Sequence, residues 1–287
     1  MSSLQDYIGK TEEELDFLAP APANALRGVL DSHRSAFSVG DPLPPQWHWL
    51  YFLPKTPQRE MGADGHPKVG GFLPDTGLPR RMFAGARVTY EKPLILGHPA
   101  RRQSQIISIE EKDGKSGRLA FVTVAHEYLQ NGQLALTEEQ TIVYRDAATE
   151  PAKTAVSKKR KASLPPLDSK ADVTPNTVML FRYSALTYNA HRIHYDRDYA
   201  VNEEFYPDLV VHGPLTAIML LDLFHKENTE QKITFYEFRG NAPFFVNRPM
   251  TLGIAHDSEH GLQWDLTAFD DKGVAGHTAK VQTQSGL

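Results

Sequence analysis

The chain has 287 residues, of which 40% are hydrophobic, so it can bury one large core or two ordinary ones. Its net charge of -4 gives no basic field for a nucleic-acid partner, and the lack of cysteine excludes a disulfide scaffold, a thiolate zinc site and a cysteine nucleophile. The N-terminus has no basic start followed by an apolar core, and no apolar run approaches membrane-spanning length. We therefore expect a cytoplasmic protein without a membrane partner.

The first half predicts one short helix, an aromatic segment and a sheet. Thr11 and Glu14 fit a capping box, which favours a helix through Leu18. Residues 20–79 are rich in proline and glycine, and within them "PPQWHWLYFL" (44–53) indicates a short buried helix or packed turn. Alternating β-branched and aromatic residues then predict four strands of an antiparallel meander at 85–96, 102–112, 117–129 and 133–145.

Residues 146–173 are rich in alanine, lysine and proline and nearly free of large apolar side chains, which is typical of a linker. After them, residues 213–228 are apolar around the whole helical circumference, so we expect a helix that is buried on all sides. Strands follow at 233–240, 248–257, 262–270 and 273–284. A long buried helix ahead of a meander predicts a sheet wrapped around that helix.

The two halves also resemble each other weakly. The residues that match are Phe83, Gly85, Pro93 and Leu96-Gly97 with Phe238, Gly240, Pro249 and Leu252-Gly253, and Gly132 and Thr137 with Gly273 and Thr278. We interpret this as a duplicated unit in which the second copy retains the helix intact. The predicted division is a degenerate N-terminal unit at 1–147, a linker at 148–172 and a C-terminal catalytic unit at 173–287.

The segment "LTYNAHRIHYDRDYA" (186–200) holds two histidines three positions apart, His191 and His194. They could bind a metal together with Asp196 or His212, could be neutral members of a polar loop, or could serve as acid and base. The spacing HxxH is common and no HExxH glutamate accompanies it, so no metal site is predicted.

The sequence "VVHGPLTAIML" (210–220) leads from this loop into the buried helix. Pro214 fits the first helical turn, so the N-H of Gly213 is free and lies at the positive end of the helix dipole. A histidine and such a helix end supply a base and an oxyanion site together. That combination suits proton chemistry next to a thioester carbonyl.

The block from Asn189 to His194 resembles the D-x-N-P-x-H signature of the MaoC-like, or R-specific, enoyl-CoA hydratases of the hot-dog fold. The stretches "PLPPQWHWLYFLP", "GGFLPDTGLPRRMFAGARV", "FRYSALTYNAHRIHYDRDYA" and "FRGNAPFF" resemble its double hot-dog branch, which includes hydroxyacyl-thioester dehydratase type 2 and hydratases of mesaconyl-C4-CoA and itaconyl-CoA. The resemblance implies an α+β double hot-dog fold and a hydro-lyase without a cofactor. It also implies that His194 is the general base and acid, and that the N-H of Gly213 is the oxyanion donor.

One departure from the signature matters chemically, because Asn189 stands where the family has aspartate. An amide cannot accept a proton as a carboxylate does, so His194 must carry the proton transfer. Asn189 then becomes the residue that positions the water.

The resemblance implies an acyl-CoA substrate, and Arg192 could pair with a second carboxylate on the acyl group or form a salt bridge with Asp196 or Asp198. A carboxylate partner favours hydration of itaconyl-CoA or mesaconyl-C4-CoA to citramalyl-CoA. The other predicted substrate contacts are Val211, His212 and Arg239, and Arg80 and Arg81 are weaker candidates for CoA phosphates or the carboxylate.

Two alternatives to this substrate remain open. The first is a 3-hydroxyacyl-ACP or -CoA dehydratase of fatty-acid metabolism, and the second is a non-catalytic acyl-CoA binding module. Because one chain with two hot-dog units already resembles a pair of simpler units, a monomer and a homodimer are both compatible with the sequence.

Overall fold

The computed structural model describes residues 3–114, 117–147, 163–257 and 260–285. Its strands are β1 (Thr11–Phe17), β2 (Arg80–Tyr90), β3 (Pro99–Gly114), β4 (Gly117–Gln130), β5 (Gln133–Arg145), β6 (Ser169–Val173), β7 (Gln231–Gly240), β8 (Met250–Asp257), β9 (Gln263–Phe269) and β10 (Ala275–Ser285). The helices are α1 (Pro20–Val29), α2 (Thr177–Leu186), α3 (Arg197–Asn202) and α4 (Gly213–Glu227), with short 3-10 helices η1 (Leu4–Tyr7), η2 (Trp47–Leu50), η3 (Gln58–Glu60) and η4 (Arg192–His194).

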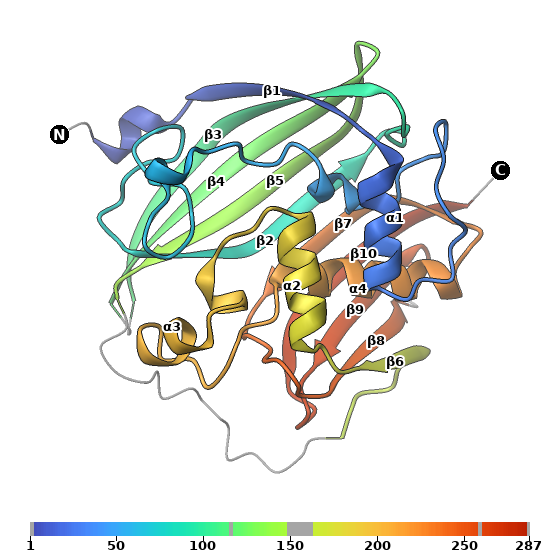
Figure 1. Ribbon diagram of the computed structural model, residues 1–287. Coiled ribbons are helices and arrows are strands. Elements are labelled where there is room, and N and C mark those ends of the chain that lie inside the picture. The colour runs from blue at the N-terminus through green and yellow to red at the C-terminus, as the bar shows by residue number, and fades with distance from the viewer. Residues whose placement is uncertain (1–2, 115–116, 148–162, 258–259, 286–287) are drawn as a thin grey trace.

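All ten of these strands form one antiparallel sheet in the order β1-β3-β4-β5-β2-β7-β10-β9-β8-β6 (Figure 1). Each half contributes five strands in the same order outward from the centre, as expected of a double hot-dog fold. The halves meet where β2 pairs with β7, and Arg87 lies opposite Glu237 there. The two sheets predicted from the sequence are therefore joined edge to edge into one.

Helix α4 is the central helix of the C-terminal half. It contacts β6, β7, β8, β9 and β10, and residues on every side of it are buried, so the prediction from its uniform apolarity is confirmed. In the N-terminal half the corresponding place holds only the short η2, whose Trp47 and Leu50 are buried. Gln46, just before η2, has φ 67°, a left-handed conformation that does not continue a helix.

The two halves share one strand order, as the repeat in the sequence predicted. The predicted residue-by-residue match is wrong, however, in the segment between β2 and β3. The residue in the place of Pro93 is Pro243 rather than Pro249. In each half an isolated bridge lies two residues after this proline, at Ile95 in the first and Phe245 in the second. These bridges hold the segments that lead into η2 and α4.

The helix predicted from Thr11 to Leu18 is wrong, because residues 11–17 form the edge strand β1 paired with β3. Glu14 accepts a hydrogen bond from the guanidinium of Arg102 at 2.9 Å, and Glu13 lies 3.6 Å from Arg101. Opposite charges on neighbouring strands stabilise this pairing, which outweighs the local capping signal.

The predicted linker at 148–172 extends too far. Its last residues form the start of β6, which pairs with β8 through Val173 and Met250, so they belong to the second unit. Residues 148–162 of the predicted linker lie outside the described residues.

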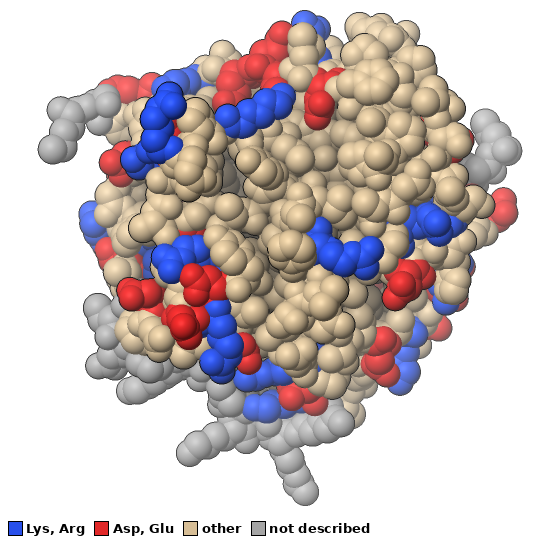
Figure 2. Space-filling model, viewed as in Figure 1, with Lys and Arg blue, Asp and Glu red and all other residues tan. Residues whose placement is uncertain are grey.

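In the described part of the chain, no helix is long and apolar enough to cross a membrane. Figure 2 shows that much of the centre and upper right of one face carries no charged side chain apart from a basic group near the middle, whereas acidic and basic side chains gather at the upper left and along the lower edge.

Candidate active site

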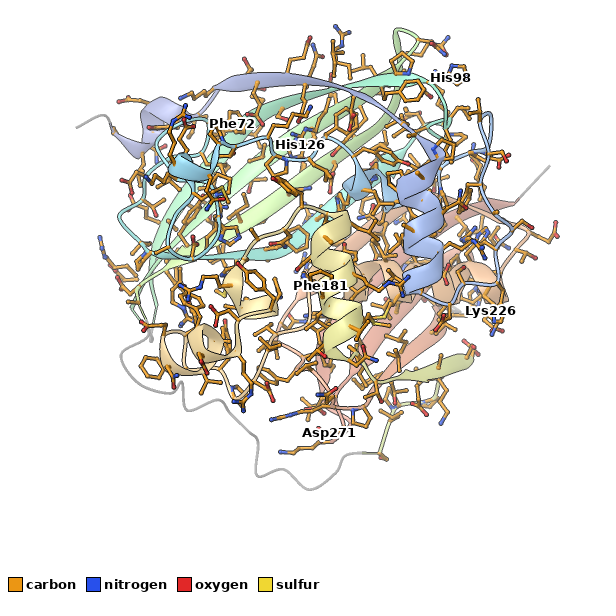
Figure 3. The ribbon with its side chains drawn as sticks, viewed as in Figure 1. Phe72, His98, His126, Phe181, Lys226 and Asp271 are labelled. Carbon is orange, nitrogen blue, oxygen red and sulfur yellow. The ribbon has the colours of Figure 1, made fainter. Side chains whose placement is uncertain are left out.

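A cavity of about 1,400 Å³ lies between the two halves. The C-terminal half lines it with the end of α2, the loop that follows α2, and the N-terminus of α4. The N-terminal half contributes β2, parts of β4 and β5, and the segment from Gln58 to Leu73. Phe181, which projects from α2 in Figure 3, is 65% exposed and lies at its rim.

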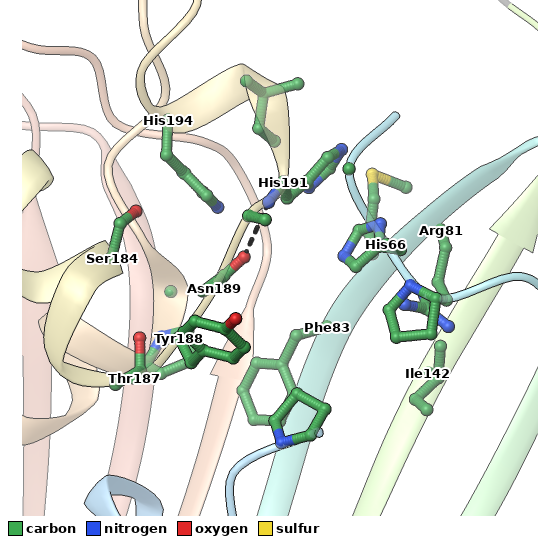
Figure 4. A pocket seen from close by; sticks show the side chains of 18 of the residues that line it. His66, Arg81, Phe83, Ile142, Ser184, Thr187, Tyr188, Asn189, His191 and His194 are labelled. Carbon is green, nitrogen blue, oxygen red and sulfur yellow. Dashed lines mark hydrogen bonds between the residues drawn. The ribbon is translucent and has the colours of Figure 1, made fainter. Parts of the chain in front are cut away.

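His194 lies in this cavity as a buried, neutral base. Its Nδ1 is 2.7 Å from the carbonyl oxygen of Val210. A carbonyl can only accept, so Nδ1 carries the proton and Nε2 is left with a free lone pair. Burial lowers the pKa of His194 to about 4, although the bond to Val210 opposes this shift. Figure 4 shows the ring directed toward the side of the cavity that holds Asn189.

His212 packs against His194 on the side away from the cavity. Its ring stacks on that of His194 with 3.7 Å between centroids, and its Nε2 lies 2.8 Å from Oγ of Ser184. The side chain is fully buried and does not line the cavity. The predicted substrate contact of His212 is therefore wrong, whereas its neighbour Val211 does line the cavity.

Asn189 lines the cavity next to the two histidines. Its Oδ1 accepts a hydrogen bond of 3.0 Å from the backbone N-H of His191, drawn as a dashed line in Figure 4. The side-chain oxygen therefore terminates the turn, and the amide NH₂ is the group left to hold a ligand. Tyr188, with φ 49°, forms the tight turn that brings Asn189 to this position.

Gly213 begins α4 at the wall of the cavity. Its N-H has no hydrogen-bond acceptor among the described residues, and an ideal Cβ placed on it would lie 3.7 Å from the ring of Phe83. A free N-H at a helix N-terminus can stabilise an oxygen that gains negative charge. Base, amide and oxyanion donor, predicted from the sequence, thus lie around one cavity.

Of the four arginines considered as substrate contacts, Arg80 and Arg81 line the cavity, whereas Arg192 and Arg239 do not. Arg192 donates through Nε and Nη2 to Asp196 at 3.0 and 2.8 Å, which agrees with the salt bridge considered as the alternative, and Nη1 donates to the carbonyl of Ala63. Arg239 is bonded to Glu237 at 2.6 Å on the surface. Arg192 therefore secures a loop of the other half, and Arg239 is a surface residue.

Asp64 and His66 belong to the site but carry no signal in the sequence. His66 Nδ1 is 2.8 Å from Asp64 Oδ2, and its ring lies 4.1 Å from that of His191. Their loop docks so closely that a Cβ on Gly65 would lie 1.8 Å from the carbonyl oxygen of Ala190. Only folding brings these distant segments together.

Asp64, His66 and His191 could hold a metal ion, since their ligand atoms lie within 4.8 Å of one another. The site considered from the sequence is different, because Asp196 is bonded to Arg192 instead. Burial would raise the pKa of Asp64, but the His66 hydrogen bond and Arg81 lower it, so Asp64 is ionised. The same Arg81 charge opposes a cation here.

The far end of the cavity is polar. Glu138 is fully buried, and its carboxylate accepts hydrogen bonds from Trp49 Nε1 at 2.8 Å and the Tyr128 hydroxyl at 3.1 Å. His48 Nε2 lies 3.0 Å away. Burial alone would raise the pKa of Glu138, but His48 and the hydrogen bonds lower it to about 2. This cluster attaches η2 to β4 and β5, close to His126 in Figure 3.

The fold is that of the double hot-dog proteins. Solved structures agree on the fold: a MaoC-like dehydratase matches with a TM-score of 0.75 at 14% identity, over 99% of this chain and 100% of that one. A double hot-dog protein from Mycobacterium tuberculosis matches with a TM-score of 0.61 at 11% identity, over 98% of each chain.

The family model of hydroxyacyl-thioester dehydratase type 2 matches residues 46–246. The mesaconyl-C4-CoA hydratase of Chloroflexus aurantiacus is 46% identical over 279 residues, which is 96% of each chain. The mitochondrial hydroxyacyl-thioester dehydratase type 2 of Schizosaccharomyces pombe is 28% identical, over 87% of this chain and 90% of its own. The chain belongs to the hydroxyacyl-thioester dehydratase type 2 family, as the resemblance in its sequence predicted.

Proposed function

We propose that this enzyme adds water to the double bond of a short branched dicarboxylic enoyl-CoA, mesaconyl-C4-CoA or itaconyl-CoA, to give citramalyl-CoA. The observation that carries the reaction type is the tautomer of His194. Because Nδ1 donates to Val210, Nε2 is an unprotonated base at neutral pH and borders the cavity. The similarity to the Chloroflexus hydratase supports the choice of acyl group.

In the proposed mechanism, the amide NH₂ of Asn189 donates a hydrogen bond to the oxygen of a water molecule. Nε2 of His194 takes a proton from this water, and the oxygen forms a bond to the β-carbon. In mesaconyl-C4-CoA, whose double bond is conjugated with the thioester, the electron pair of the double bond moves onto the thioester oxygen, which the N-H of Gly213 stabilises. Histidinium then returns the proton to the α-carbon, and dehydration follows the same path in reverse.

His194→Ala tests this assignment. We expect kcat to fall by roughly 100- to 10,000-fold, because general base and acid catalysis is lost. Hydration is followed by the loss of enoyl-thioester absorbance and thiol release by a colorimetric reagent, so hydratase and thioesterase activities are separated. Thermal melting verifies that the variant folds. A folded variant with near-normal kcat would exclude His194 as the base.

A second candidate follows from the extent of the cavity, which reaches beyond the base to the β4 and β5 side. That extension gives room for the longer acyl chain of a linear 3-hydroxyacyl thioester. The same assay with crotonyl-CoA and longer trans-2-enoyl-CoA esters distinguishes the candidates. A kcat/KM that rises with chain length would favour the second, and a preference for mesaconyl-C4-CoA would favour the first.

A further inference from the structure

Arg81 differs from other cationic side chains around the cavity. Arg80 is paired with Glu204, and Arg102 is paired with Glu14 at 2.9 Å. Arg81 lines the cavity and forms no ion pair with any described residue. Arg81 as a whole is half-buried, and a charge removed from water is costly unless an opposite charge is supplied. Arg81 therefore has no carboxylate at ion-pair distance among the described residues, although the ionised Asp64 lies close enough for the two charges to interact.

The nearby carboxylate of Asp64 is already engaged. One oxygen lies 2.8 Å from the ring Nδ1 of His66 and the other accepts the backbone N-H of the same residue at 2.9 Å. The surroundings of Arg81 thus favour an anion.

An acyl-CoA with a dicarboxylic acyl group carries two kinds of anion, the CoA phosphates and the free carboxylate, and the position of Arg81 in the cavity indicates which of them it can contact. Figure 4 shows Arg81 and His66 on one side of the cavity, Asn189 and His194 on the other, and the ring of Phe83 between them.

Arg81 lies close enough to His191 for its charge to lower the pKa of that histidine, and the His191 ring is 5.5 Å from the ring of His194. CoA phosphates are separated from the thioester by the pantetheine arm, so a cation this near to His194 lies at the acyl end. In mesaconyl-C4-CoA the free carboxylate is attached to the β-carbon, the atom that the water attacks.

We infer that Arg81 binds the free carboxylate of a dicarboxylic acyl group and is the residue that selects this substrate class. This inference rests on the proposed function. A planar guanidinium matches a carboxylate with two parallel hydrogen bonds. The β-carbon is then held between this anchor and the water on Asn189. Binding of the free carboxylate, considered for Arg192 from the sequence, is thus assigned to a residue of the N-terminal half.

The experiment compares wild type, Arg81→Met, Arg81→Lys and the control Arg239→Gln. The matched substrates are mesaconyl-C4-CoA and crotonyl-CoA, which has hydrogen in place of the carboxylate. For Arg81→Met, kcat/KM with mesaconyl-C4-CoA should fall roughly 100-fold, and kcat/KM with crotonyl-CoA should stay within about threefold of wild type. Arg81→Lys should keep part of the preference, and Arg239→Gln should keep all of it.

Calorimetric Kd values for the same two ligands, measured in the His194→Ala background so that neither ester is turned over, provide a second readout. If wild type hydrates neither ester, the proposed function fails, but the Kd values still test the inference: Arg81→Met must weaken only mesaconyl-C4-CoA. If Arg81→Met does not fold, the inference is tested instead by Arg81→Lys and by the ratio of the two Kd values for the protein with Arg81. Equal losses on both ligands, a wild-type preference for crotonyl-CoA, or one tightly bound metal ion per purified chain would overturn the inference.

Discussion

The proposed catalytic base, His194, should stay deprotonated at pH values well below the ordinary pKa of a histidine. Burial lowers the pKa of His194 from 6.5 to about 4, which corresponds to roughly 3 kcal/mol against the imidazolium form. The base is therefore deprotonated throughout the neutral and mildly acidic range. We expect the acid limb of kcat/KM for hydration to have its midpoint near pH 4 rather than near 6.5.

The fold itself loses stability in the same range, so the two effects must be separated. Burial also lowers the pKa values of His126 and His277 to about 4. Between pH 6.5 and 4 the unfolded chain binds protons that the folded chain does not. The free energy of unfolding is therefore highest above pH 6.5 and decreases as the pH falls toward 4.

The assay uses initial rates after rapid dilution from pH 7.5 into buffers from pH 4 to 8, with enoyl-thioester absorbance as the signal. Crotonyl-CoA is included because its acyl group has no carboxylate to titrate. A portion of each sample is returned to pH 7.5, where recovery of the full rate shows that the enzyme did not unfold irreversibly. A reversible acid limb with its midpoint near 6.5, at a pH where the melting temperature is unchanged, would refute a buried His194 as the base.

Three substitutions test how the loops build the site. Gly65→Ala should lower the free energy of unfolding by about 2 kcal/mol in chemical denaturation, because φ is +90° and the new Cβ would collide with the carbonyl of Ala190. Asn189→Asp should keep part of the wild-type kcat, since one carboxylate oxygen can still accept the N-H of His191 and the other can hold the water by accepting one of its protons; complete loss would contradict this expectation and show that only an N-H donor at this position can hold the water. Arg192→Ala should lower kcat/KM roughly tenfold for mesaconyl-C4-CoA and crotonyl-CoA alike, because it releases the loop at Ala63; loss on mesaconyl-C4-CoA alone would restore its substrate role.

The strands could be predicted where local patterns and tertiary packing agree. The turn between β4 and β5 uses Asn131 at φ 52° and Gly132 at φ 72°, the left-handed pair expected of a tight hairpin. β1 could not be predicted, because its run of glutamates is a good helix start in isolation. Its partners Arg101 and Arg102 are far away in sequence, and only the sheet register brings them opposite.

The C-terminal part of the candidate site could be predicted from the sequence by itself. His194, Asn189 and Gly213 lie within one short segment, whose loop and helix start follow from local backbone chemistry. The tertiary structure alone decided the rest, since His66, which is bonded to Asp64, and Arg81 reach the cavity only through docking of the N-terminal half. It also decided which arginine is free, because pairing of a charge depends on which carboxylates lie within reach after folding, and sequence spacing does not contain that distance.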